Sequence, residues 1–517
     1  MRYIRTMKLH KLWLLALLSS LLLVGCSETE QLGETESSEI NKIFKTGVAH
    51  PDDAFVRAET FRVIELLADP ALGVYAKEGL ADKSSMVRVA SLRATLATNP
   101  ADGEAAAAQV FSRGTTDERR AVLTAVSAYE MGPGQRELLG RALRSEDPDL
   151  RRIAFEANFL QRVDEAVAAK QTKLLETSIF PELGRYVGVD KDPVLAALAL
   201  EKFLEVGQTD RADPLLSALA RDDLPLEKRL LAARILVWAH AKPALEPFHK
   251  IIARHDEILA DQSLGIPTEI VPAAMLRLAI LGTVSAGDTT HIKRAQAYVN
   301  NVSDAAAMEV LEALGPNPSP EAAVTLKVAM GDARRDVRLR AIELYEQRPD
   351  ADPAALIKAL KGADFETQKR LTRVLVTRFR EPWVTELRSR VQRASEMENT
   401  LALLRDVVTS KEEADVLIVP MRDVFQKIVD EEKDRRASLA SYFLAITAPS
   451  SEEASKIVAQ DLDDPTRYAY IEYLVRTDPK GSVETFRKYF YDDLFVIRLM
   501  SAAGLWRVLG GSPSAED

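Results

Sequence analysis

The feature that most constrains the fold is a recurring pair, an Asp followed six residues later by an Arg. The pairs are Asp82/Arg88, Asp223/Arg229, Asp332/Arg338, Asp364/Arg370 and Asp492/Arg498. Early in the chain the spacing is regular, with arginines 31 or 32 residues apart at Arg57, Arg88, Arg120 and Arg151. Most of them are followed four positions later by an apolar residue, which indicates one face of a helix. The chain is therefore built from short helical repeats.

A second apolar segment lies between successive arginines, as in residues 71–80 and 101–111. Turn signals such as Asp69-Pro70 and Asn99-Pro100 separate the segments. The unit is a helix, a short turn and a second helix, about 31 residues long. It resembles the HEAT repeat family, particularly the short bacterial repeats similar to those of phycobilisome lyases. The resemblance covers residues 47–161, 191–240, 332–380 and 461–508, and it implies an all-α superhelical solenoid.

We expect roughly a dozen repeats over residues 47–509, because each repeat must stack on its neighbours to bury its apolar face. Residues 177–190 and 256–271 interrupt the spacing and are predicted to be insertions. Residues 510–517 are predicted to be a disordered tail.

The repeated Asp and Arg have a structural role in such a stack. Asp in the turn can accept free N–H groups at the start of the second helix. Arg can reach the Asp of its own or the next repeat and form a ladder, as in the family that the sequence resembles. Repetition at many positions argues against catalysis, because active sites are not built a dozen times.

The first 25 residues have the pattern of a secretory signal. Four basic residues precede an apolar run from Leu12 to Gly25, which is short for a membrane span. The run ends in Leu23-Val24-Gly25-Cys26, which resembles the lipobox of bacterial lipoproteins. That resemblance implies cleavage before Cys26, diacylglycerol on its thiol and an acyl chain, such as palmitate, on its amino group. Either Met1 or Met7 can be the start.

Residues 26–46 follow as the acylated Cys26 and a Ser- and Glu-rich segment, predicted to be a flexible tether. Ser27 after the cysteine resembles outer-membrane sorting, so we expect anchoring there, on the periplasmic face, in a Gram-negative bacterium. The inner membrane and the cell surface stay open. The net charge is −10, and loss of the four basic signal residues makes it −14, which argues against general nucleic-acid binding.

No catalytic residue, metal site or cofactor is predicted. Gaps of nine and six residues separate His240, His249 and His255, which do not fit ligands on one helix face. Cys26 is the single cysteine, and its use for lipid leaves no thiol for a lyase-type bilin attachment.

Two segments are candidates for binding a partner. Residues 367–393 carry a local charge of +6 and could meet an anionic partner, such as lipid A, a polysaccharide or an acidic protein face. The candidate side chains there are Arg380, Arg388, Arg390 and Arg393. Aromatic residues crowd positions 468–506 and either close the core or form an interface.

The sequence favours a membrane-anchored, non-enzymatic scaffold that binds an unidentified protein in the periplasm. The alternative is an accessory subunit or enzyme of cell-envelope assembly with a site formed between distant repeats. A fold alone does not decide between them.

Replacing Cys26 with Ala tests the anchor. Because Cys26 is the only thiol in the chain, Cys26→Ala should abolish lipid labelling and leave a soluble or uncleaved protein. Labelling with radioactive palmitate and membrane fractionation measure this. Normal cleavage with full membrane retention would contradict the lipoprotein hypothesis.

Overall fold

The computed structural model describes residues 34–129, 132–260, 271–301, 303–458 and 462–509. Within these ranges the chain forms helices joined by turns, and no residue is in a β-strand. The predicted all-α helical-repeat fold is confirmed. Across the same ranges, no helix combines the length and the apolar character needed to cross a bilayer.

The described helices form fourteen successive pairs, in which a first helix or broken helix leads into a second. The first helices are α2 (Glu34–Val48), α4 (Gly73–Ala76), α6 (Pro100–Arg113), α8 (Pro133–Ala142), α11 (Thr172–Leu174) with α12 (Phe180–Gly184), α14 (Asp213–Ala220), α16 (Leu245–Ala260), α18 (Ile292–Asn301), α20 (Pro320–Ala329), α22 (Pro353–Ala359), α24 (Arg380–Gln392), α26 (Lys411–Leu417) with α27 (Arg422–Glu431), α29 (Ser451–Val458) and α31 (Val483–Tyr489). The second helices are α3 (Ala54–Leu67), α5 (Ser85–Thr98), α7 (Thr116–Ser127), α9 (Pro148–Phe155) continuing into α10 (Gln161–Ala168), α13 (Pro193–Glu205), α15 (Leu226–Trp238), α17 (Ala273–Ser285), α19 (Asp304–Leu314), α21 (Arg335–Gln347), α23 (Phe365–Arg378), α25 (Ala394–Val407), α28 (Arg435–Ile446), α30 (Asp464–Thr477) and α32 (Phe495–Leu509).

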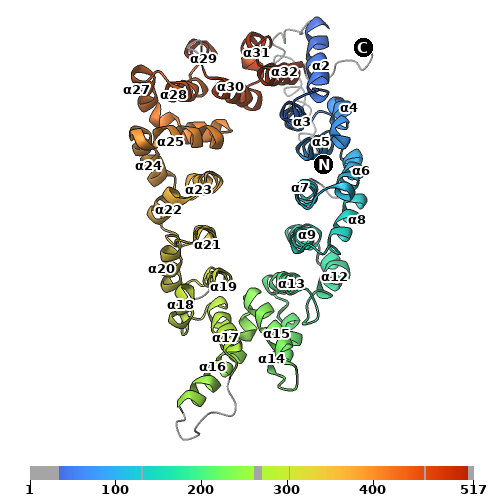
Figure 1. Cartoon of the computed structure of the whole chain (residues 1–517), viewed down its shortest axis with the longest axis vertical. Helices are drawn as coiled ribbons and strands as arrows, with labels where there is room; N and C mark the ends of the chain where they lie inside the picture. Colours follow the sequence, from blue (N-terminus) through green and yellow to red (C-terminus); the bar gives the residue numbers. More distant parts are fainter. Residues whose placement is uncertain (1–33, 130–131, 261–270, 302, 459–461, 510–517) are drawn as a thin grey trace, which may run out of the picture.

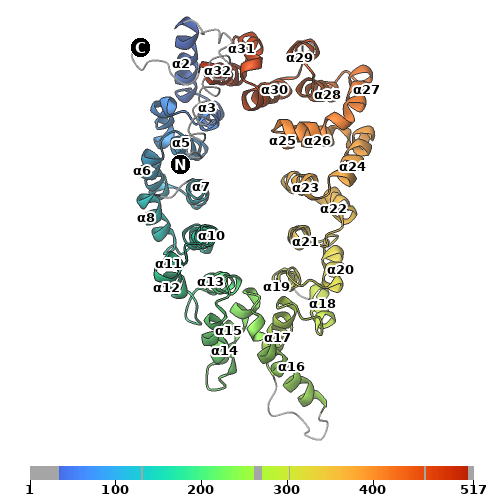
Figure 2. The same cartoon turned by 180° about the vertical axis from the view of Figure 1, so that it is seen from behind.

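The pairs stack into an elongated closed ring, with the second helices on its inner side (Figures 1 and 2). Helices α14 to α17 form one narrow end, and at the other end α30 to α32 return to α2 and α3. Each first helix runs in the opposite direction to the second helices and returns the chain to the same rim. The second helices therefore run parallel to one another. They therefore all begin along the same rim of the ring.

Helix α2 contradicts part of the prediction that residues 26–46 form a flexible tether. Residues 34–46 are not flexible but belong to α2, whose Ile40 and Phe44 are fully buried. Their spacing of four places both on one helix face, and that face packs on α3 and α32. The signal segment, Cys26 and the rest of the tether lie outside the described residues, as do the tail 510–517 and residues 261–270 of the second predicted insertion.

The prediction that residues 177–190 form an insertion is also wrong in part. Residues 177–184 complete the broken helix that precedes α13, and Ile179 and Leu183 are fully buried there. A π-helical turn over Leu175–Ile179 shifts the spacing of apolar residues, so the sequence lost its regular period although the helix pair was kept.

The ring junction, where α2 and α3 meet α30, α31 and α32, is part of the apolar core. Phe44 of α2 meets Trp506 of α32 edge to face, with ring centroids 5.9 Å apart. One continuous cluster of buried residues includes Ile40 to Val87 and extends through the C-terminal repeats to Trp506. At Gly47 a Cβ would overlap the Thr60 hydroxyl and lie 3.2 Å from the Phe495 ring, so a glycine permits this close approach.

Polar contacts surround this apolar centre. The indole N–H of Trp506 donates to Asp69 (2.8 Å), and Arg507 donates to the carbonyl of Leu66 (2.8 Å). On α2, Glu36 pairs with Arg487 (3.1 Å). Most aromatic residues of 468–506 are therefore part of the core, and Trp506 covers the first repeat of the same chain, whereas Tyr491 is 71% exposed.

Phe44→Ala should open the ring junction. It removes a fully buried ring and should cost about 3–5 kcal/mol of packing, mostly between the two chain ends. Small-angle scattering of the detergent-solubilised protein should show a larger radius of gyration.

Phe425→Ala is the matched control, since Phe425 is equally buried but packs against Phe443 within the C-terminal half. It should lower stability and leave the ring closed. Equal expansion of both variants would contradict a specific role of the junction.

Candidate functional site

The repeated aspartates lie at the rim where the inner helices begin. Asp53 accepts from the N–H groups of Phe55 (2.7 Å) and Val56, and Asp364 accepts from Thr367 (2.9 Å). Asp82, Asp332 and Asp492 each accept from the N–H two residues later, at distances of 2.8–2.9 Å. Asp53 and Asp364 thus cap the N-termini of α3 and α23, whose first N–H donors have no partner within the helix. Asp82, Asp332 and Asp492 instead fix the turn, since the N–H that each binds belongs to the residue just before its helix.

Arginines link one repeat to the next along the same rim. Arg57 donates from Nε (2.7 Å) and Nη2 (3.1 Å) to both carboxylate oxygens of Asp82. The other contacts of this type are Arg88 with Glu118 (2.8 Å), Arg120 with Asp147 (3.2 Å), Arg151 with Asp192 (2.6 Å), Arg335 with Asp364 (2.8 Å) and Arg467 with Asp492 (3.4 Å).

Within one repeat, the arginine of the pair binds backbone and not the aspartate side chain. Arg88, Arg338 and Arg498 donate to the carbonyl of the Asp six residues earlier, at 2.5–2.7 Å. Two arginines differ. Arg229 pairs with Asp222 (3.0 Å), since Asp223 pairs with Arg221, and Arg370 pairs with Glu346 (2.7 Å) of the preceding repeat.

These contacts keep the aspartates ionised. Burial by itself raises the pKa of Asp82, but hydrogen bonds from Arg57 and from the Ser84 N–H outweigh it and hold the pKa below its ordinary value. For Asp332 the hydrogen bond from Arg334 has the largest effect and also lowers the pKa. A permanently ionised, fully bonded carboxylate suits a structural link better than proton transfer.

The basic segment 367–393 is not a free cationic surface. Arg390 is 8% exposed and donates to Glu386 (2.9 Å) and to the carbonyl of Ile357. Arg393 pairs with Glu386 and Glu396, both at 2.9 Å, and Arg388 with Asp423. Glu396 and Asp423, which a count within the segment leaves out, therefore offset part of the +6 charge. Arg390 is not available to a partner, and Arg380, Arg388 and Arg393 stay a prediction.

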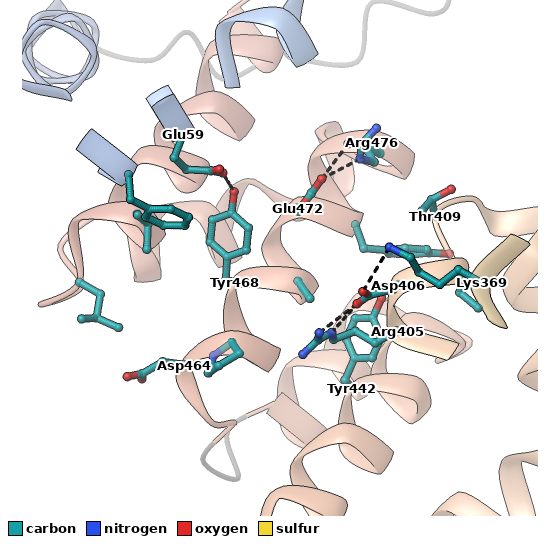
Figure 3. Close-up of a pocket in the computed structure, with 17 residues that line it drawn as sticks. Glu59, Lys369, Arg405, Asp406, Thr409, Tyr442, Asp464, Tyr468, Glu472 and Arg476 are labelled. Carbon is teal, nitrogen blue, oxygen red and sulfur yellow. Dashed lines mark hydrogen bonds and ion pairs between the residues drawn. The ribbon is translucent and has the colours of Figure 1, made fainter. Parts of the chain in front are cut away.

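A cavity lies at the ring junction, and we name it the junction pocket (Figure 3). Its volume is about 580 Å³, within the range of ligand sites. Its walls come from both ends of the chain, with Phe55 and Glu59 of α3 on one side and residues of α23, α25, α28 and α30 on the others. Tyr442, Tyr468 and Tyr473 are among the lining residues.

Charged residues of the pocket are bonded to one another across the junction. The Tyr468 hydroxyl donates to Glu59 and accepts from Arg62, and Arg62 also pairs with Glu472 (3.0 Å). Burial raises the pKa of Glu472 by itself, but Arg62 and Arg476 (2.7 Å) outweigh it and lower the pKa. Burial, reinforced by Glu59, raises the pKa of Tyr468 well above its ordinary value.

Figure 3 places Arg405 and Lys369 on the opposite wall, both directed toward Asp406. Arg405 donates to Asp406 (2.9 Å), and Lys369 lies 4.0 Å from the same carboxylate. The lining carboxylates and cations are thus engaged with each other, an arrangement that suits binding rather than proton transfer.

A second cavity, the α3–α7 groove, continues from the pocket along the start of the inner helices. It is lined by residues of α3, α5 and α7, and it shares Phe55 and Glu59 with the junction pocket. Phe55 is 59% exposed, and Met86 of α5 is 48% exposed. Leu494, which lines the pocket just before α32, is 38% exposed. We call Leu494, Phe55 and Met86 the apolar strip.

The sequence missed the strip and most of the pocket. Phe55 and Met86 stand at the second position of their helices, where a repeat pattern marks them only as near a turn. Glu59 and Tyr468 are 409 residues apart, so no local pattern joins them. The crowding of aromatics over 468–506 was the one signal that pointed to this region.

A charged cluster occupies the inside of the narrow end. Glu309 of α19 lies 3.0 Å from Arg277 of α17 and 3.8 Å from Arg234 of α15. On neighbouring α13, Glu201 lies 3.9 Å from His240. Burial, together with the negative charges of Glu205 and Glu312, raises the pKa of Glu201 to about 7.

Of the other histidines, His249 pairs with Asp288 (2.7 Å) and His255 with Asp256 (3.0 Å). In the described ranges, no three side chains of His, Cys, Asp or Glu come together as metal ligands would.

Comparison with known proteins gives no family. No family model matches the chain, and no curated protein matches it. Among solved structures, Kap121p matches with 12% identity and a TM-score of 0.29, covering 91% of this chain and 56% of that one. An engineered protein matches with 15% identity and a TM-score of 0.19, covering 92% of this chain and 100% of that one.

A chain from the AP-3 complex matches with 11% identity and a TM-score of 0.26, covering 93% of this chain and 92% of that one. The chain spans a little over half of Kap121p. At such TM-scores the matches establish no shared chain path, and function has to be argued from the site itself.

Glu201→Gln should change how stability depends on pH. The folded pKa of about 7 lies above the ordinary value of 4.5, so the folded state binds this proton more tightly than the unfolded state. The stabilising contribution is complete below pH 4.5 and is lost as pH rises through 7.

The wild type should therefore lose more thermal stability than Glu201→Gln between pH 5 and 8. Melting curves across this range measure the difference, with exposed Glu227→Gln as control. Parallel pH profiles for the wild type and Glu201→Gln would refute the raised pKa.

Proposed function

We propose that this chain is a lipid-anchored, non-enzymatic scaffold that binds a protein partner in the cell envelope, on the periplasmic face of the outer membrane. The anchor rests on the lipobox ending at Cys26. Partner binding rests on one observation, the exposed apolar strip beside two connected cavities at the ring junction. Exposed apolar surface of this kind is typical of interaction sites.

The inner rim supports this function in a second way. Ion pairs between repeats hold the starts of the inner helices in fixed register, as Arg57 with Asp82 does between α3 and α5. Phe55 and Met86 stand at these helix starts, so they are presented on a rigid frame. A preorganised surface loses less entropy on binding.

The alternative is an enzyme or accessory subunit with a site between distant repeats, and the junction pocket has that location. The carboxylates that line this pocket form ion pairs, as Glu472 does with Arg62 and Arg476. This favours a binding function over catalysis.

Photo-crosslinking in membranes tests the proposal. A photoreactive phenylalanine analogue replacing Phe55 or Met86 should give a discrete adduct with one protein. The control position is Val328, which is 71% exposed on the outer helix α20, and it should give none. Adducts at Val328 alone, or none at the strip, would contradict the proposed binding face.

A further inference from the structure

We propose that the apolar strip takes an extended polypeptide segment that carries positive charge and has an apolar side chain at every third position. This inference rests on the proposed function, because it specifies the partner of the same surface. It follows from the spacing of the strip, from the charges beside it and from the position of the strip across the ring junction.

The spacing follows from helix packing. Leu494, Phe55 and Met86 stand at the starts of three neighbouring inner helices, α32, α3 and α5, which pack in that order. Packed helices lie about 8–10 Å apart. An extended chain in the polyproline II conformation advances about 3.1 Å per residue with three residues per turn. Every third side chain therefore points the same way and meets the next helix. The cavities on either side of Phe55 give room for such side chains.

The charges beside the strip are mainly negative. Seven carboxylates and five cations line the two cavities. Exposed Asp493 immediately precedes Leu494, and exposed Asp52 and Asp53 stand just before Phe55. Beyond Met86, Asp117 is 91% exposed, and Lys83 is the exposed cation between Asp82 and Met86.

The basic segment 367–393 suggested an acidic partner, whereas the charges beside the strip favour a basic one. In that segment Arg388, Arg390 and Arg393 are engaged by neighbouring acids, whereas Asp52 and Asp493 beside the strip are exposed to solvent. Lys and Arg between the apolar residues of a partner would face these carboxylates, which favours encounter with a basic segment over an acidic one.

The strip also crosses from one end of the chain to the other. Leu494 belongs to the last repeat, and Phe55 and Met86 belong to the first two. A segment in contact with all three side chains holds α32 against α3, so its binding stabilises the closed ring. By linkage, bound peptide should raise the melting temperature of the wild type.

The test uses the detergent-solubilised lipoprotein and synthetic fluorescent peptides. The first peptide has Leu at every third position with Lys and Ser between, the second has Glu in place of Lys, and the third has the composition of the first with its Leu residues clustered. Anisotropy titrations at low and physiological salt give the affinities.

We expect the first peptide to bind at least about tenfold more tightly than the other two. Its affinity should fall as salt rises, because exposed charges are screened. Phe55→Ser and Met86→Ser should each weaken it about tenfold or more. Both side chains are exposed, so these variants should fold.

Phe365→Ser is the matched control. Phe365 stands at the start of inner helix α23 and is 41% exposed on the same rim, but in a different repeat. It should leave peptide affinity unchanged. Equal binding of the acidic or clustered peptide, or loss of binding in Phe365→Ser as large as in Phe55→Ser, would overturn the inference.

The outcome separates this inference from the proposed function. If photo-crosslinking at Phe55 captures a partner but the basic peptide fails to bind, the strip is an interface and its partner is not an extended basic segment. If neither gives a signal at the strip, both proposals fail.

Discussion

The contact between the last helix and the first pair is the interaction on which the rest of the structure depends. Without Trp506 against Phe44, the helix pairs would form an open superhelix with two exposed ends. With it, one apolar core passes from the C-terminal repeats into the N-terminal ones. Closure also gives α2 its partner surface, and it places Phe55 and Glu59 opposite Tyr468 to form the junction pocket.

The ladder of aspartates and arginines has a different function, since it fixes the distance and register between neighbouring repeats. Each contact is local, as Arg57 with Asp82 is. Small deviations in the spacing and register between neighbouring repeats would add up along a long stack. The two ends of the stack nevertheless have to meet within van der Waals distance. Bidentate, partly buried pairs have a defined geometry, and this property suits them to a ring.

Charge illustrates why a count along the sequence misleads in a repeat protein. The segment 367–393 is basic by itself, but Glu346, Glu396 and Asp423 lie outside it and pair with its arginines. Acidic residues near Phe55 and Leu494 are spread over the two ends of the chain, so they form no cluster in the sequence. Folding brings them together on one rim and makes that rim, rather than the basic segment, the stronger candidate for binding a charged partner.

The sequence by itself determined the helical-repeat fold and the aspartates in the turns before inner helices, of which Asp53 and Asp364 cap α3 and α23, because both depend on residues within about 31 positions of each other. It also marked the aromatic residues near the C-terminus, but left open whether they close the core or form an interface. Only the tertiary structure decided that the stack closes on itself, that residues 34–46 are helical and that a pocket joins α3 to α30. These features depend on the small rotation between successive pairs, summed over fourteen of them. No local pattern encodes such a sum, so contacts such as that of Glu59 with Tyr468, 409 residues away, follow only from the complete ring.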